Sequence, residues 1–200
     1  MFKITEVVKH LLIINVLLFA LLQTPFMREY LVHFVIQAPP NFKPYQLITH
    51  FFMHANTQHL LMNMMGLFFL GPTVESRLGS KNFFILYFTC GLAGSVLPFL
   101  FHFAGIAQMA PSLGASAATI GVSVAFATLL PDTKLQLMFI PVPIKAKYLI
   151  GALILLDLAG GVGKILGMYN SRIGHLAHLG GAIAAFLLTY FYFRRIIYRS

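Results

Sequence analysis

A run of fifty residues without Asp, Glu, Lys or Arg, from Asn82 to Pro131, limits most strongly what this chain can fold into. A helix needs about 20 apolar residues to cross a bilayer once, so the run is long enough to cross twice. Pro111 and Gly114 interrupt it near its middle with turn-forming residues. The run therefore predicts two membrane-spanning helices, the second beginning close to Ser116.

The composition agrees with a membrane protein. Hydrophobic residues make up 58% of the chain and charged residues 10%, whereas about 25% of residues are charged in soluble domains. The apolar residues form continuous blocks rather than alternating, which favours helices over a β-barrel. The net charge of +9 comes from basic residues in short gaps between these blocks, so no nucleic-acid partner is expected. The single cysteine, Cys90, excludes a disulfide framework.

Six apolar segments predict an all-α, polytopic membrane protein with one domain over residues 1–200 and the lipid bilayer as its surroundings. No small-residue cleavage site follows the first segment, so we expect a retained span rather than a signal peptide. Residues 25–56 are too polar and too rich in proline to cross, and they predict a membrane-associated loop. The expected spans are residues 10–23, 57–74, 82–103, 115–131, 148–163 and 173–193.

The distribution of Lys and Arg predicts the orientation of these spans. With six spans, both termini share a side, and ten of the basic residues fall on it: Lys3, Lys9, Arg77, Lys81, Lys134, Lys145, Lys147, Arg194, Arg195 and Arg199. The opposite side receives four: Arg28, Lys43, Lys164 and Arg172. Positive charge collects on the cytoplasmic side, so both termini are expected there. The second, fourth and sixth helices then all begin at the outer face.

Two of these helix beginnings carry a hydroxyl and an imidazole. Ser116 follows a turn of small residues, where free N–H groups and the positive end of the helix dipole gather. His178 lies about one turn inside the sixth apolar segment, where an ionisable group is costly unless it has partners or water. Small residues such as Gly121 and Gly181 allow the two helices to approach closely. We therefore expect His178 to lie near Ser116, as a base near a nucleophile.

The beginning of the second helix carries two further polar groups, His59 and Asn63. Their spacing of four residues places both on one face of a helix. Both side chains can donate hydrogen bonds to a single point, as an oxyanion requires. The sequence therefore predicts an oxyanion site beside a serine nucleophile.

Three motifs, taken together and in this order on six spans, resemble the rhomboid family of intramembrane serine proteases, in its bacterial, six-helix form. They are His50-x3-His54-x4-His59-x3-Asn63, then Gly114-x-Ser116, then Ala177-His178-x2-Gly181. The turn from Glu75 to Ser80 also resembles the family's motif after its second helix.

The resemblance implies a serine endopeptidase that cuts transmembrane segments of other membrane proteins through a Ser-His dyad without a carboxylate. Ser116 would be the nucleophile and His178 the general base and acid. His59, Asn63 and the Ser116 backbone N–H would form the oxyanion hole. The resemblance also implies the bacterial cytoplasmic membrane, with the active site open to the outer face.

The chain departs from the family pattern at three places. Ala117 stands where the family has a glycine, and its methyl group narrows the space beside Ser116. Ile120 replaces an aromatic residue that packs on the base, so something else must orient His178. Tyr45-Gln46 replaces an aromatic-arginine pair in the first loop.

Several alternatives stay open. An inactive, client-binding relative would be consistent with the residues at positions 117 and 120, and a transporter would use Asp157 with the intramembrane histidines. His50 and His54 are expected to support the first loop, and His175 is expected to lie near the site without a chemical role. No cofactor and no metal are expected, because the histidines lack Cys, acidic neighbours or a His-Glu-x-x-His pattern.

Overall fold

The computed structural model describes residues 3–24, 27, 29–136, 142–168, 174–193 and 195. The expected start of the sixth span at residue 173 and the basic residues Arg28, Arg172, Arg194 and Arg199 lie outside these ranges. Six longer helices occur among the described residues: α1 (Glu6–Leu22), α5 (Thr57–Leu78), α6 (Ser80–Phe103), α7 (Ser116–Leu129), α8 (Ala146–Ile165) and α9 (His175–Leu187). A π-helical turn, η2 (Leu188–Phe193), continues α9.

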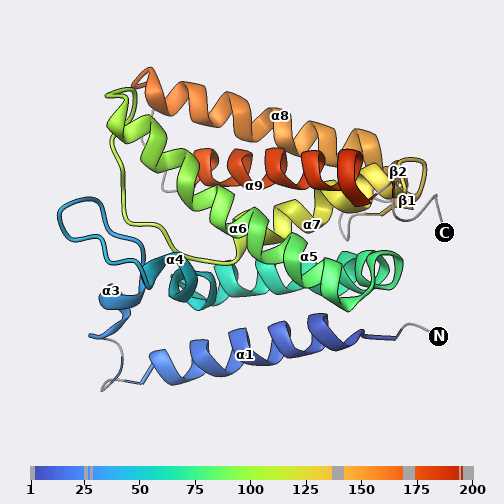
Figure 1. Ribbon diagram of the computed structural model, residues 1–200, viewed down its shortest axis with the longest axis horizontal. Helices are drawn as coiled ribbons and strands as arrows, with labels where there is room; N and C mark the ends of the chain where they lie inside the picture. The colour runs from blue at the N-terminus through green and yellow to red at the C-terminus, as the bar shows by residue number, and fades with distance from the viewer. Residues whose placement is uncertain are drawn as a thin grey trace.

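Successive long helices run in alternating directions through one bundle (Figure 1). The beginnings of α5, α7 and α9 therefore lie toward one end of the bundle, and the beginning of α1 lies at the other end. Helix α9 packs against three other long helices, α6, α7 and α8. This arrangement brings the three helix beginnings singled out in the sequence to the same end.

The loop between α1 and α5 folds back onto that end. It contains the short helices α3 (Leu31–Phe34) and α4 (Gln46–Thr49) and the 3-10 turn η1 (His50–Phe52). Ile36 forms an antiparallel bridge with Ser112, through N···O distances of 2.9 and 3.0 Å. The loop is therefore tied to the segment that enters α7.

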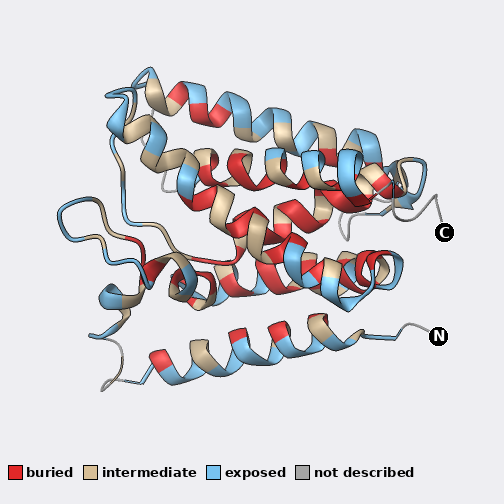
Figure 2. Cartoon of the chain, in the orientation of Figure 1, coloured by how far each residue is buried: buried red, intermediate tan, exposed pale blue. Residues whose placement is uncertain are grey.

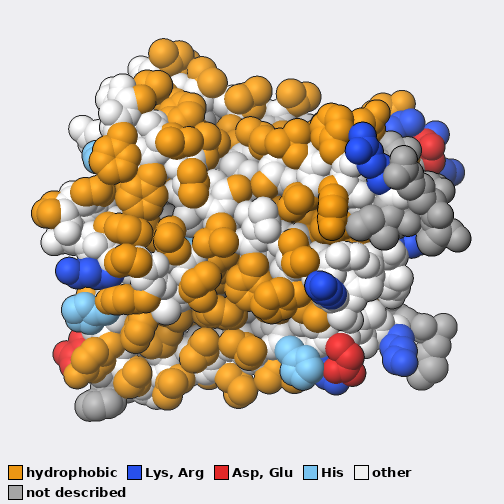
Figure 3. Space-filling view, in the orientation of Figure 1, with side chains coloured by type: hydrophobic (Ala, Val, Ile, Leu, Met, Phe, Trp, Pro, Cys, Tyr) orange, Lys and Arg blue, Asp and Glu red, His pale blue; other side chains and the backbone are white. Residues whose placement is uncertain are grey.

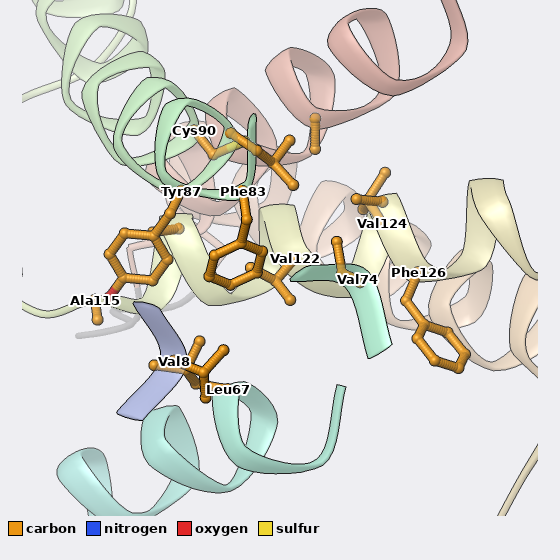
Figure 4. Close-up of a cluster of buried hydrophobic side chains, with 14 of the residues drawn as sticks. Val8, Leu67, Val74, Phe83, Tyr87, Cys90, Ala115, Val122, Val124 and Phe126 are labelled. Atoms are coloured by element: carbon orange, nitrogen blue, oxygen red, sulfur yellow. The ribbon is translucent and has the colours of Figure 1, made fainter. Parts of the chain in front are cut away.

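The hydrophobic core lies where α1, α5, α6 and α7 meet. Figure 2 shows buried residues concentrated on α7 and on the inner sides of its neighbours, whereas the outer sides of α1 and α8 are exposed. Figure 4 shows side chains from these helices in contact, including Val8, Leu67, Phe83, Tyr87 and Val122. The core therefore holds α7, and with it Ser116, in a fixed position.

Helix α5 ends later than the sequence predicts, at Leu78 rather than residue 74. Pro72 lies inside the helix without ending it, and Glu75 on the added turn is only 2% exposed. The Glu75 carboxylate accepts hydrogen bonds from the N–H groups of Val7 and Val8 at 3.1 and 3.0 Å. These N–H groups have no partner inside α1, so Glu75 caps that helix and holds it against α5.

The surface is that of a membrane protein. Hydrophobic side chains cover most of the face in Figure 3, and the charged side chains lie mainly toward its two ends. Three helical stretches in the described ranges are long and apolar enough to cross a membrane: Ser80–Phe103, Ala146–Ile165 and His175–Phe193. Helix α7 is apolar but has 14 residues, so its length is about 21 Å.

The expected loop after α7 contains a small antiparallel ribbon. Strand β1 (Lys134–Leu135) pairs with β2 (Ile144–Lys145), a detail that the polar, proline-rich sequence did not predict. Lys145 and Lys147 each form an ion pair with Asp132 at 3.0 Å. The ribbon brings the end of α7 close to the beginning of α8.

Candidate active site

Ser116 is the first residue of α7, so its N–H is among those that lack a partner inside the helix. The turn before it requires glycine at position 114, where φ is +108°. A Cβ atom there would also lie 2.6 Å from Cε1 and 2.8 Å from Nε2 of His59. Gly114 therefore lets the α7 entry turn lie directly against the His59 ring.

His50 holds this turn in place from the first loop. Its carbonyl oxygen accepts a hydrogen bond from the Gly114 N–H at 2.8 Å. Its Nδ1 lies 2.7 Å from the Gln46 carbonyl oxygen, and its Nε2 lies 3.1 Å from Ser95 Oγ. Because a carbonyl only accepts, Nδ1 carries the proton and Nε2 accepts from Ser95. Burial lowers the pKa of His50 to about 4, which keeps the ring neutral.

His54 is also buried in this loop, with 2% of its surface exposed. Its ring lies edge-on to that of His59, with centroids 5.2 Å apart. Burial, and then the neighbouring charge of His59, lower the pKa of His54 to about 4. His54 therefore supports the position of His59 as a neutral ring.

His59 and Asn63 lie on the first turns of α5. The Asn56 side chain caps this helix by accepting a hydrogen bond from the His59 N–H at 2.8 Å. The Asn63 oxygen accepts a longer hydrogen bond from Thr119 Oγ1 at 3.4 Å, which links α5 to α7. This bond orients the Asn63 amide. No motif in the sequence had pointed to Thr119.

The amide nitrogen of Asn63 is a buried donor without a hydrogen-bond partner among the described residues. It lies 3.6 Å from the place where a Cβ of Gly114 would be, on the same side as the His59 ring. An unpaired buried donor costs about 1–3 kcal/mol, so native proteins keep few of them. The arrangement provides a donor for an acceptor that arrives beside the α7 entry turn.

Helices α7 and α9 touch through their backbones. A Cβ at Gly181 would overlap the carbonyl oxygen of Ala117, the residue after Ser116. His178 precedes Gly181 by almost one helical turn on the same helix. His178 also lies close enough to His59 for the two rings to interact electrostatically. His59 and Asn63 therefore lie beside the turn that leads to Ser116, and His178 lies close to His59; that His178 serves Ser116 stays a prediction.

The carboxylate of Asp157, for which the sequence predicted no such contact, lies against His178. Nδ1 of His178 lies 3.0 and 3.1 Å from the two carboxylate oxygens of Asp157 on α8. Nδ1 of His175 lies 2.7 Å from the same carboxylate. The prediction that no carboxylate lies beside His178 is therefore wrong. His175, which was expected only to lie near the site, contacts the same carboxylate.

The two departures near Ser116 are accommodated by the packing. The Ala117 methyl group is buried against Gly94 of α6, where a second Cβ would overlap it. Ile120 packs against the main hydrophobic core. The Ala117 methyl therefore fills the contact between α6 and α7, contrary to the expectation that it narrows the space at the serine.

A pocket of about 580 Å³ lies between the segment 106–112, the last turns of α8 and the first turn of α9. Its lining includes Ser112, His175 and Ala177. The polar groups in this lining can hold water, but the lining does not include Ser116, His178, His59 or Asn63. Within the described ranges, no three His, Cys, Asp or Glu side chains come together as metal ligands.

Comparisons with known proteins give one family and several relatives. Residues 41–195 match the family description "Rhomboid domain". "Rhomboid protein 1, mitochondrial" of Saccharomyces cerevisiae is 33% identical over 186 residues, covering 90% of this chain and 51% of the relative. "Presenilin-associated rhomboid-like protein, mitochondrial" of Homo sapiens is 30% identical over 173 residues, covering 84% of this chain and 44% of the relative.

A third relative, "Presenilin-associated rhomboid-like protein A, mitochondrial" of Danio rerio, is 29% identical over 180 residues, covering 89% of this chain and 45% of the relative. The chain spans about half the length of the curated relatives it matches. All three are mitochondrial proteins, so the expected bacterial type has no support among them.

Proposed function

Because the chain belongs to the rhomboid family, we propose that it is an intramembrane serine endopeptidase that cuts transmembrane segments of other membrane proteins. Ser116 is the nucleophile, and His178 is the general base and acid. The observation that carries the proposal is the unpaired amide donor of Asn63, buried beside His59 and the entry turn of α7.

The proposed reaction has two stages. In the first, Nε2 of His178 takes the Ser116 hydroxyl proton while Oγ bonds to the scissile carbonyl carbon. The carbonyl oxygen becomes an oxyanion that accepts hydrogen bonds from His59, Asn63 and the Ser116 N–H. The C–N bond then breaks, and His178 returns its proton to the leaving nitrogen.

In the second stage, a water molecule gives a proton to His178 and attacks the acyl carbon. The ester bond to Ser116 breaks, Oγ regains the proton from His178, and the new carboxyl end leaves. The pocket beside Ala177 and Ser112 supports this stage, because it can hold water against the residue that precedes His178 on α9. No cofactor or metal takes part in the proposed reaction.

The substrate is a transmembrane helix that unwinds locally. A helical backbone hides its carbonyls in hydrogen bonds, so helix-weakening residues with small side chains near the cut favour cleavage. The 14 residues of α7 are short for a membrane about 30 Å thick. If α7 ends at one membrane surface, Ser116 therefore lies below the other.

The proposal keeps the membrane orientation expected from Lys and Arg. Six spans place both termini on one side, and the site opens toward the other, where α5, α7 and α9 begin. The bacterial cytoplasmic membrane is not part of the proposal, because the matched relatives are mitochondrial.

A client-binding protein without catalysis is the second candidate. The replacement of an aromatic residue by Ile120 favours it, because that residue packs on the base in the family pattern. The contact between His178 and Asp157 weighs against it, since this contact provides another means of orienting the base.

Cleavage of a model transmembrane substrate in proteoliposomes tests the proposed function. We expect the wild type to release two products, identified by mass, and Ser116→Ala to release none. Ser123→Ala is the matched control, because this hydroxyl on α7 donates to Thr119 of its own helix at 3.0 Å. Binding of the substrate by folded wild type without any product would instead support the client-binding protein.

A further inference from the structure

Asp157 on α8 lies between the imidazoles of two histidines on α9. Its carboxylate oxygens are 3.0 and 3.1 Å from Nδ1 of His178, and one of them is 2.7 Å from Nδ1 of His175. All three side chains are shielded from solvent, with exposures of 15% for Asp157, 10% for His175 and 15% for His178. The carboxylate therefore bonds to both rings in a region shielded from water, where the low dielectric constant strengthens hydrogen bonds.

The contact determines which nitrogen of His178 carries the proton. An ionised carboxylate only accepts hydrogen bonds, so Nδ1 of each ring must be the donor. In the neutral ring, Nε2 then keeps its lone pair. A base at Ser116 needs that form of the ring, because Nε2 must accept the hydroxyl proton.

We propose that Asp157 is a positioning residue that fixes the Nδ1–H tautomer and the ring orientation of His178, and that His175 holds Asp157 in place through a second contact with the same carboxylate. The proposal rests on the proposed function, because it assigns Asp157 a role in proton transfer to and from Ser116. Asp157 also stabilises the imidazolium that forms when His178 takes that proton. It touches neither the substrate nor the reacting atoms.

The packing of α8 against α9 supports the role of His175. A Cβ atom at Gly160 would lie 2.5–2.8 Å from three ring atoms of His175, so only glycine leaves room for the ring there. The next residue, Gly161, has ordinary spacing, with His175 Cβ at 3.5 Å. The ring of His175 is thus held between the α8 backbone and Asp157.

The first test compares Asp157→Asn with wild type for cleavage of a transmembrane substrate. The amide matches the carboxylate in shape but its NH₂ group can donate a hydrogen bond, which removes the preference for Nδ1–H. We expect kcat to fall roughly 10²- to 10⁴-fold, as for a buried aspartate behind a catalytic histidine, with KM changed less than about threefold because Asp157 does not touch substrate. Asp157→Glu should recover part of kcat, and Asp132→Asn, an exposed carboxylate in a loop, should leave it unchanged.

A loss confined to KM, or a kcat within threefold of wild type, would overturn the role of Asp157. If wild type cuts the substrate and Asp157→Asn cuts it equally well, the positioning role fails while the proposed function stands. If wild type neither cuts nor reacts with a serine probe, the proposed function fails as well.

A second test uses folded wild type, so it does not depend on whether Asp157→Asn folds. Nitrogen-15 NMR of histidine-labelled protein distinguishes the two neutral tautomers, and His178→Gln assigns the signal. We expect His178 as the Nδ1–H tautomer at neutral pH. The Nε2–H tautomer would overturn the proposal, whatever the activity of the variants.

A pair of glycine variants tests the supporting role of His175. Gly160→Ala should push the His175 ring from Asp157 and lower kcat severalfold, with KM unchanged, whereas Gly161→Ala should behave as wild type. The Nδ1 signal of His175 should shift in the first variant alone. Equal kcat and unchanged His175 signals in both variants would exclude His175 from the arrangement.

Discussion

At the scale of single residues, the candidate site combines groups that the chain separates widely. Spacing along one helix was enough to pair His59 with Asn63, whereas Ser116 became a candidate only when its turn was combined with the histidines on the second and sixth segments. Asp157 could not be placed in the same way. It lies 21 residues before His178, and the contact depends on how α8 rotates against α9, which no local pattern encodes. Thr119 was missed for the same reason, since its partner Asn63 is 56 residues away.

Removal of the unpaired donor tests the oxyanion site. We expect Asn63→Ala to lower kcat by about 10²- to 10³-fold, because one preorganised donor to an oxyanion contributes about that much. The free energy of unfolding should fall by only about 0.5–1.5 kcal/mol, because the nitrogen has no partner among the described residues and the oxygen accepts one long bond from Thr119. The measurement is cleavage kinetics with a transmembrane substrate in detergent.

Asn82→Ala is the matched control, because the Asn82 side chain bonds to Leu78, away from the site. A kcat of Asn63→Ala within twofold of this control would exclude Asn63 as an oxyanion donor.

At the scale of elements, glycines set the distances between helices. The sequence predicted that α7 and α9 approach through small residues, and Gly181 lies against the Ala117 backbone as expected. The helix ends were harder to predict, since α5 passes through Pro72 and continues to Leu78. The hydrogen bonds from α1 to Glu75 favour this extra turn, and they come from residues about 70 positions earlier.

Gly181→Ala should separate α7 from α9. The added Cβ overlaps backbone atoms of Ala117, which cannot move aside like a flexible side chain. We expect the free energy of unfolding to fall by about 1–3 kcal/mol, and cleavage to be mostly lost because His178 moves from Ser116. Gly66→Ala, where the Cβ would meet nothing within 4 Å, is the control. Equal activity in the two variants would contradict the close contact.

Glu75→Gln should weaken the attachment of α1. Replacing the carboxylate weakens its hydrogen bonds with Val7, Val8, Thr5 and Ser80, so we expect a loss of about 1–3 kcal/mol in unfolding free energy. Glu6→Gln is the control, because Glu6 is 70% exposed and its ion pairs, with Lys9 and with protonated His10, lie at the surface. Similar unfolding midpoints for both variants would show that Glu75 does not cap α1.

At the scale of the whole molecule, the alternating apolar and polar segments were enough to predict an all-α membrane protein. Six long helices lie close to the expected ranges, and three stretches among the described residues meet the length and composition of a span. That α1, α5 and α7 also cross the membrane remains a prediction, because α1 and α5 carry polar side chains and α7 is short. The ribbon between α7 and α8 depends on pairing rather than on apolar pattern, so composition did not indicate it.

The free energy of unfolding of the whole bundle should decrease in mild acid. Burial lowers the pKa of His50 and of His54 from 6.5 to about 4 in the folded protein. Between these values the unfolded chain binds protons that the folded protein does not, so the free energy of unfolding decreases as pH falls from about 6.5 toward 4. Thermal unfolding in detergent from pH 8 to pH 4.5 measures this effect.

His33→Asn, which changes an exposed histidine in the same loop, should keep the wild-type pH dependence. A wild-type stability that stays constant from pH 6.5 to pH 4.5 would contradict the burial of neutral His50 and His54.

Labelling with a fluorophosphonate serine probe tests the central claim most directly. Purified wild type in detergent should be labelled, whereas Ser116→Ala and His178→Ala should not, and His102→Ala on α6 should be labelled as wild type. Mass analysis of the labelled peptide should place the adduct on Ser116. Folded wild type that stays unlabelled, or a label that survives in Ser116→Ala, would contradict an activated serine at the beginning of α7.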